Sequence, residues 1–205
     1  TRVRLQAKRV TLGATAVHMQ VRHELDVVCR LLRSAGIESL LLKGPAVTLD
    51  PLRQFSDLDL LIREESLGHA VAVLESADYR YRGSQVLDKE EKNSPFRSLR
   101  WNNQFSYRSP RSQLCIELHT NLFERDRIRL EGIDRLLENI DLFWERSYWS
   151  EELRSRLPAR ECTAALICLH AALKRSPAQN TFILRHPYDL HAFLQDGLEE
   201  PRFLS

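Results

Sequence analysis

Two aspartates one residue apart are the side chains of this chain that are best placed to do chemistry. Asp57 and Asp59 lie in the run Arg53–Ile62, which reads RQFSDLDLLI. Side chains two apart on a strand project from the same face, so the two carboxylates would lie about 7 Å apart on it. Oxygen ligands of this kind suit Mg²⁺, and the pair predicts a divalent metal site. An isolated Asp-x-Asp pair is also compatible with solvated acids or with acids paired to arginine.

A third carboxylate, Glu117, lies in the run Cys115–His119. Alternation places Cys115, Glu117 and His119 on one face of a strand, with apolar residues on the other. Transfer of a phosphoryl or nucleotidyl group by two metal ions needs carboxylates that hold the ions about 3.5 to 4 Å apart. Glu117 can complete such a site, although a surface glutamate on an edge strand would show the same pattern. His119 can orient Glu117, contact a phosphate or simply pack in the core.

The elements that would position these acids can be read from the apolar spacing. Gln104–Tyr107 and Gln113–His119 flank a turn at Ser109–Ser112, which predicts a hairpin. We expect Glu117 to stand on an antiparallel neighbour of the Asp57–Ile62 strand. Three- and four-residue apolar steps predict helices elsewhere, and one short apolar run predicts a buried strand. The helices are expected at Thr11–Ala35, after Ser66, within Ile128–Trp149, after Pro158 and at Pro187–Leu194, and the buried strand at Ile37–Leu42.

These elements predict an α+β protein with two parts. Residues 1–125 would form a mixed α/β core with an N-terminal helix, and residues 126–205 a helical domain. No internal repeat or low-complexity linker separates them.

Composition narrows the class of protein. The 205 residues are 43% hydrophobic and 28% charged, with a net charge of +2. This balance gives no strong signal for binding a long nucleic acid. No stretch has the roughly 20 apolar residues of a membrane span, and the first residues lack the apolar centre of a signal peptide. The four cysteines show no metal-ligand or disulfide spacing, so we expect reduced thiols and a cytoplasmic location.

The ordered combination of motifs resembles the polymerase-β-like nucleotidyltransferase superfamily, in particular its branch of poorly characterised bacterial nucleotidyltransferases. The matching segments are Leu41-Leu42-Lys43-Gly44-Pro45-Ala46, Arg53–Ile62, Ile116-Glu117-Leu118-His119, Leu169-His170-Ala171-Ala172 and Tyr188-Asp189-Leu190. The resemblance spans residues 37 to 194. It implies a mixed sheet with flanking helices and a C-terminal helical domain.

Residue roles follow from the resemblance. It assigns Asp57, Asp59 and Glu117 to the catalytic metal ions, which would be Mg²⁺ or Mn²⁺. It assigns the binding of the nucleotide to a second set, which comprises Lys43, Gly44, Arg53 and Ser56. Two positions depart from the usual pattern of the superfamily. Pro45 replaces the serine after the glycine and removes an N–H donor, and Glu117 replaces an aspartate.

The expected function is transfer of a nucleoside monophosphate from an NTP to a hydroxyl on a protein, an RNA end or a small molecule. Pro45 and Glu117 leave open a second hypothesis, in which the chain is an inactive nucleotide-binding regulatory or antitoxin-like module. A third hypothesis is a protein-interaction domain that binds no nucleotide. Stability measurements with metal ions and NTPs would separate the three.

Overall fold

The computed structural model describes residues 2–47, 55–82, 104–122, 140–173 and 185–195. Its elements follow one another along the chain with these bounds: α1 Arg2–Ser34, β1 Ser39–Leu41, a 3-10 helix Gly44–Ala46, β2 Asp57–Ile62, a 3-10 helix Glu64–Ser66, α2 Leu67–Ser76, β3 Arg80–Tyr81, β4 Gln104–Arg108, β5 Cys115–His119, α4 Ile140–Glu145, β6 Ser147–Ser150, β7 Ser155–Pro158, α5 Arg160–Leu173 and α6 Arg185–Gln195. The expected helices and the hairpin of β4 and β5 are among them.

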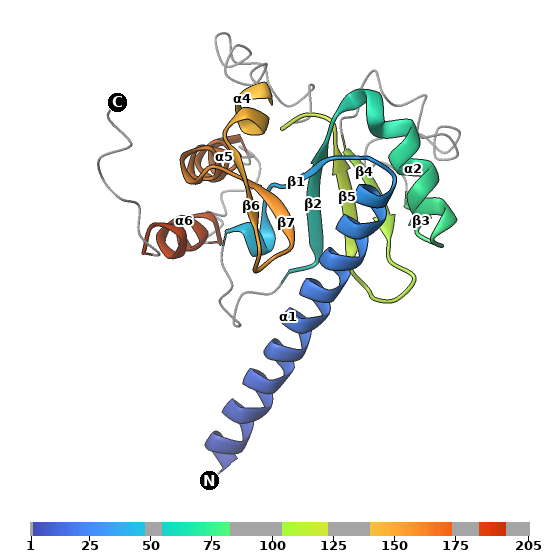
Figure 1. Ribbon diagram of the computed structural model, residues 1–205. Helices are drawn as coiled ribbons and strands as arrows, with labels where there is room; N and C mark the ends of the chain where they lie inside the picture. Colours follow the sequence, from blue (N-terminus) through green and yellow to red (C-terminus); the bar gives the residue numbers. More distant parts are fainter. Residues whose placement is uncertain (1, 48–54, 83–103, 123–139, 174–184, 196–205) are drawn as a thin grey trace.

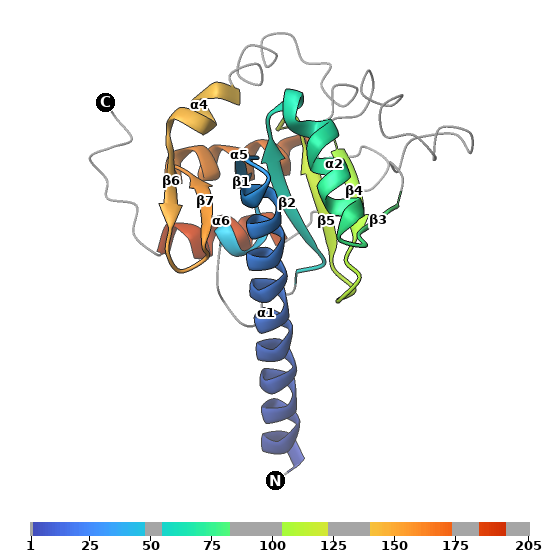
Figure 2. The same cartoon turned by 45° about the vertical axis from the view of Figure 1, so that its right-hand side comes forward.

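The strands form one mixed sheet in the order β3-β4-β5-β2-β1-β7-β6 (Figure 1). Figure 2 shows α1 and α2 on one side of this sheet and α5 and α6 on the other. The predicted α+β class with a mixed sheet and flanking helices is therefore confirmed.

Alternation along β2 divides its side chains between the two faces of the sheet. Leu58, Leu60 and Ile62 are fully buried in the core that α1 and α2 cover. Leu61 points the other way and packs in a second cluster that includes Trp144 of α4 and Leu166 of α5. Asp57 and Asp59 alternate with the first set, so they belong to the second face.

Helix α1 ends where the glycine predicts. The Gly36 N–H donates to Arg33 O, and the Ile37 N–H donates to Leu32 O at 2.9 Å. Gly36 has a φ of +73°, which fits a left-handed C-terminal cap. At its other end α1 begins at Arg2, earlier than predicted, and extends away from the sheet (Figure 1). In the part of the chain that the structure describes, even this helix lacks the apolar run needed to cross a membrane.

The direction of β5 relative to β2 differs from the sequence-based expectation. The two strands are parallel, with Asp59 directly opposite Glu117. Helix α2 brings the chain back to the end of the sheet at which β2 began, so β3 runs in the same direction as β2. Because β4 is antiparallel to β3 and β5 is antiparallel to β4, β5 is again parallel to β2. The expected antiparallel pairing was wrong, but the two acids still meet.

The expectation of an all-helical second half was also wrong. Strands β6 and β7 form an antiparallel pair, and β7 pairs in parallel with β1. Leu153 and Leu157 enter the same core as α1. This non-local pairing overrides the helical apolar spacing that continues to Trp149. The predicted boundary at residue 125 lies outside the described residues.

Candidate functional site

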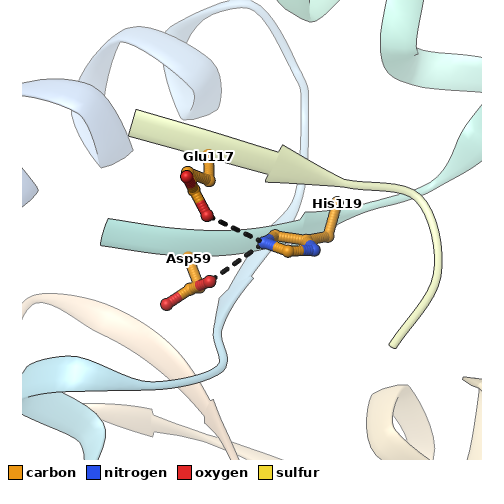
Figure 3. A group of neighbouring side chains, drawn as sticks. All are labelled: Asp59, Glu117 and His119. Carbon is orange, nitrogen blue, oxygen red and sulfur yellow. Dashed lines mark hydrogen bonds and ion pairs between the residues drawn. The ribbon is translucent and has the colours of Figure 1, made fainter. Parts of the chain in front are cut away.

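Asp59 and Glu117 lie side by side because their strands are adjacent and in register. His119 follows Glu117 on the same face of β5. One donor atom from each of these three residues lies within 4.8 Å of the other two. Figure 3 shows the three side chains converging from β2 and β5. Of the three acids expected to converge, Asp59 and Glu117 do so together with His119, whereas Asp57 is not part of this group.

His119 contacts both acids with the same ring nitrogen. Its Nε2 lies 3.0 Å from Asp59 Oδ1 and 3.8 Å from Glu117 Oε2. The residue is 6% exposed. Of the roles considered for His119, the orientation of neighbouring carboxylates is the one that these contacts support.

Strand β4 supplies two hydrogen-bond donors that the sequence analysis missed. The Gln104 side-chain amide donates to Glu117 Oε2, and Ser106 Oγ donates to Glu117 Oε1 at 3.2 Å. Ser106 is the register partner of Glu117, and Gln104 is the partner of His119. Counting residues outward from the hairpin turn would have placed both donors on the acidic face.

Asp59 is held as a carboxylate despite its burial. Burial alone would raise its pKa, but the Lys43 ammonium and the hydrogen bond with His119 together hold the pKa well below its usual range. Lys43 Nζ lies 3.3 Å from Asp59 Oδ1, the same oxygen that faces His119. Two positive or proton-donating groups therefore converge on one carboxylate oxygen.

Glu117 has the opposite electrostatic environment. Its burial raises its pKa, and the negative charges of Asp59 and Asp57 raise it further. The His119 imidazole and the Ser106 hydroxyl oppose this rise only in part. Asp59 already has a positively charged partner in Lys43, whereas Glu117 faces mainly negative charge. A cation bound between the two carboxylates would compensate this excess of negative charge.

Gly44, in the segment that follows β1, lies close to the backbone of Asp57. Gly44 has a φ of +69°, and a Cβ added to it would lie 3.6 Å from the Phe55 ring and 3.8 Å from Asp57 O. A side chain at this position would be strained and would fill the space beside β2. Pro45 is buried in the 3-10 helix that follows. Asp57 is half-buried and lies opposite Cys115 in the strand register. It precedes Asp59 by two residues on β2 and therefore lies beside the cluster of Asp59, Glu117 and His119.

Ser56 and Arg53 are the other two predicted nucleotide-binding residues. Ser56 is exposed directly before Asp57, and its carbonyl accepts a hydrogen bond from the Cys115 N–H at 3.0 Å. Arg53 lies outside the described residues. The proposed contacts of both residues with phosphate remain predictions.

The chain resembles nucleotidyltransferases in sequence profile and in fold. The profile of the family described as uncharacterised nucleotidyltransferases matches residues 1–204. No curated protein matches significantly. The solution structure of the antibiotic-resistance factor ANT(2'')-Ia is similar with a TM-score of 0.52 at 11% identity, over 89% of this chain and 84% of that one.

A second similar structure is the lincosamide antibiotic adenylyltransferase LnuA bound to lincomycin, with a TM-score of 0.50 at 12% identity, over 85% of this chain and 97% of that one. A third is ANT(2'')-Ia in complex with adenylyl-2''-tobramycin, with a TM-score of 0.50 at 11% identity, over 89% of both chains. At these identities the likeness establishes a shared fold.

Proposed function

Because this chain belongs to the family of uncharacterised nucleotidyltransferases, an enzyme class, we propose that it transfers a nucleoside monophosphate from an NTP to a hydroxyl with the help of divalent metal ions. The observation that carries the proposal is the convergence of Asp59, Glu117 and His119 on one face of the sheet. The approach of Gly44 to Asp57 supports it, because a turn without a side chain beside the acids leaves room for phosphate groups.

The donor set fits a divalent cation. Two carboxylates and one imidazole offer ligand atoms within 4.8 Å of one another, and carboxylate oxygens suit both Mg²⁺ and Mn²⁺. The raised pKa of Glu117 has burial and the charge of Asp59 as its main causes. A cation shared by these two carboxylates would offset both effects.

The acids and Lys43 would have separate roles in the transfer reaction. Asp57, Asp59 and Glu117 would hold the metal ions, which when bound orient the triphosphate and lower the pKa of the acceptor hydroxyl. The acceptor oxygen passes its proton to solvent water and forms a bond to the α-phosphorus. The bond between that phosphorus and the bridging oxygen then breaks, and pyrophosphate leaves. Lys43, freed from Asp59, would balance charge on the phosphates.

The fixed position of Glu117 matters for this reaction. Its side chain is one methylene longer than the aspartate usual in the superfamily, and a shift of about 1 Å in a reacting group can cost about 100-fold in rate. Gln104 and Ser106 hold its two oxygens from β4. These hydrogen bonds set the longer side chain in a single orientation, which supports an active site.

The acceptor class remains open among a protein side chain, an RNA end and a small molecule. Two solved structures with this fold are described with an antibiotic or an adenylylated antibiotic bound. Small hydroxylated molecules therefore belong in any panel of acceptors. We also propose a cytoplasmic location, because the four cysteines are all unpaired thiols, as is usual in reducing compartments.

Binding is the first half of the test. The free energy of unfolding is measured with Mg²⁺ or Mn²⁺ and each NTP, and a ligand at 100 times its Kd adds about 2.7 kcal/mol. We expect stabilisation that requires metal and nucleotide together and that disappears in Asp59→Asn. Glu65→Gln, which changes an exposed acid, is the matched control and should behave like wild type. Failure of every pairing of metal and NTP to stabilise the chain would refute the proposal.

Transfer is the second half of the test. NTPs labelled in the α-phosphate are incubated with the protein and with fractionated cell extract, and labelled products are sought. Product that depends on Asp59 supports the enzyme. Binding without product in any fraction would favour the inactive nucleotide-binding module, for which Pro45 is the structural argument: it is buried and brings no N–H to the turn.

A further inference from the structure

His119 brings an imidazole nitrogen into a site whose other donors are carboxylate oxygens. Its Nε2 lies 3.0 Å from Asp59 Oδ1 and 3.8 Å from Glu117 Oε2. The side chain is only 7% exposed, so packing fixes the ring in this position. Mg²⁺ binds proteins through oxygen and retains several waters, whereas imidazole suits transition metals. A nitrogen donor in this place therefore bears on which ion the site prefers.

We propose that His119 Nε2 is a metal ligand together with Asp59 and Glu117, and that this mixed donor set makes the site prefer Mn²⁺ over Mg²⁺. The inference rests on the proposed function, because it takes this cluster to be the divalent metal site of nucleotidyl transfer. It goes further by adding a nitrogen ligand and by naming the preferred ion.

The orientation of the ring supports coordination. Figure 3 shows Nε2 directed at the two carboxylates, with the other ring nitrogen pointing away from them. Coordination through Nε2 requires a neutral imidazole that carries its proton on Nδ1. Entry of the ion would replace the contact between Nε2 and Asp59, and Lys43 Nζ would leave the same carboxylate oxygen.

No thiolate joins this donor set. Cys115 lies on the same face of β5, two residues before Glu117, but its sulfur accepts a hydrogen bond from Arg82 Nη1 at 3.2 Å. Zn²⁺ favours sulfur and nitrogen ligands, whereas a set with mostly carboxylate oxygens suits Mn²⁺. The composition of the cluster thus points to Mn²⁺ as the ion that uses both its oxygens and its nitrogen.

Pulsed electron paramagnetic resonance of bound Mn²⁺ tests the nitrogen ligand directly. Wild-type protein is prepared with ordinary histidine and with ¹⁵N-labelled histidine, and each is loaded with Mn²⁺. We expect nitrogen modulation from a directly bound imidazole that changes with the isotope. The signal should be absent in His119→Gln and unchanged in His69→Gln, which alters an exposed histidine of α2. Bound Mn²⁺ without nitrogen modulation in the wild type would overturn the inference.

Competition between the two ions tests the preference. Mg²⁺ is titrated against bound Mn²⁺, and the ratio of Mn²⁺ affinity to Mg²⁺ affinity is compared between wild type and the variants. Loss of even a group that supports a ligand costs about tenfold or more in metal affinity, so His119→Gln should lower the Mn²⁺ affinity by at least this factor. Mg²⁺, which binds through oxygen, should lose less, so the ratio of Mn²⁺ affinity to Mg²⁺ affinity should fall. His69→Gln should leave it unchanged. An equal ratio in His119→Gln and wild type would overturn the inference.

The outcomes separate this inference from the proposed function. Mn²⁺ that binds, is lost in Asp59→Asn and shows no imidazole nitrogen would refute the role of His119 and leave the nucleotidyltransferase proposal standing. Absence of both Mn²⁺ and Mg²⁺ binding would refute the metal site itself. If His119→Gln fails to fold, the isotope comparison in wild-type protein still decides the nitrogen ligand.

Discussion

Asp59 and Glu117 are direct register partners on the parallel strands β2 and β5. Hydrogen-bonded strands, rather than loops, therefore set the separation of their backbones. Sites built on such elements hold their side chains more precisely than sites built on loops. The longer side chain of Glu117 is steadied from β4 on one side and lies against His119 on the other.

Neutral replacements of the two acids should have different effects. Asp59→Asn should lose both the binding of metal with NTP and the transfer reaction, because it removes one of the two carboxylates of the cluster. Glu117→Gln should retain measurable binding through Asp57 and Asp59 but lose most of the transfer, because the third carboxylate serves the acceptor more than the nucleotide. Nucleotide titration and product formation are measured for each variant. Transfer by Glu117→Gln at the wild-type rate would remove Glu117 from the mechanism.

The hydrogen bond from Ser106 should matter for turnover more than for binding. Ser106→Ala removes a donor 3.2 Å from Glu117 Oε1 and leaves Gln104 as the remaining support from β4. Loss of a group that orients a metal ligand costs about 10- to 100-fold, and we expect kcat to fall within this range while NTP affinity changes little. Ser76→Ala, at an exposed position of α2, is the control. Equal kcat in both variants would contradict a positioning role.

Lys43→Ala should separate the binding of nucleotide from the binding of metal. The ammonium contacts Asp59 Oδ1, and the lysine side chain is only 24% exposed. Its removal should weaken NTP binding and lower the free energy of unfolding by about 1–2 kcal/mol, because a buried carboxylate loses one of its partners. The affinity for metal ion alone should not fall, since the ion no longer competes with the lysine. Titrations of metal and NTP beside the exposed control Arg154→Ala check this, and unchanged NTP affinity would exclude Lys43 from the site.

Much of the site could be predicted from local pattern. The alternation of acids with leucines in Asp57–Ile62 fixes which face each side chain takes, because the period of a strand is two residues. The same rule placed Glu117 and His119 together. These inferences needed no knowledge of what lies next to each strand.

Pairing between distant segments could not be predicted in this way. The parallel direction of β5 depends on α2 and β3, and the addition of β7 beside β1 joins segments more than 100 residues apart. Tyr148 and Trp149 continue a helical apolar spacing, yet they lie on a strand, because pairing with β7 outweighs local preference. Gln104 and Ser106 were missed since polar residues on a strand carry no signal until the register is known.

Two buried tyrosines provide a matched pair of stability variants. The Tyr79 hydroxyl donates to Glu24, which is 1% exposed, whereas the Tyr107 hydroxyl has no hydrogen-bond partner among the described residues. Tyr79→Phe should lower the free energy of unfolding by about 1–3 kcal/mol because a buried carboxylate loses a donor. Tyr107→Phe should be close to neutral. Urea denaturation near pH 8 measures both, and equal losses would contradict the importance of the bond to Glu24.

Above about pH 10 the free energy of unfolding should fall more steeply in wild type than in either tyrosine variant. Burial raises the pKa of both hydroxyls, and Glu24 raises that of Tyr79 further. In the unfolded chain a tyrosine loses its proton near pH 10. The contribution of each neutral hydroxyl is therefore fully present below about pH 10 and is lost as pH rises towards the folded pKa, with a slope of at most about 1.4 kcal/mol per pH unit and residue. Each Phe variant should flatten the fall in unfolding free energy between about pH 10 and 11.5, relative to wild type. A slope that stays at the wild-type value in Tyr79→Phe would show that this hydroxyl ionises equally easily in the folded chain.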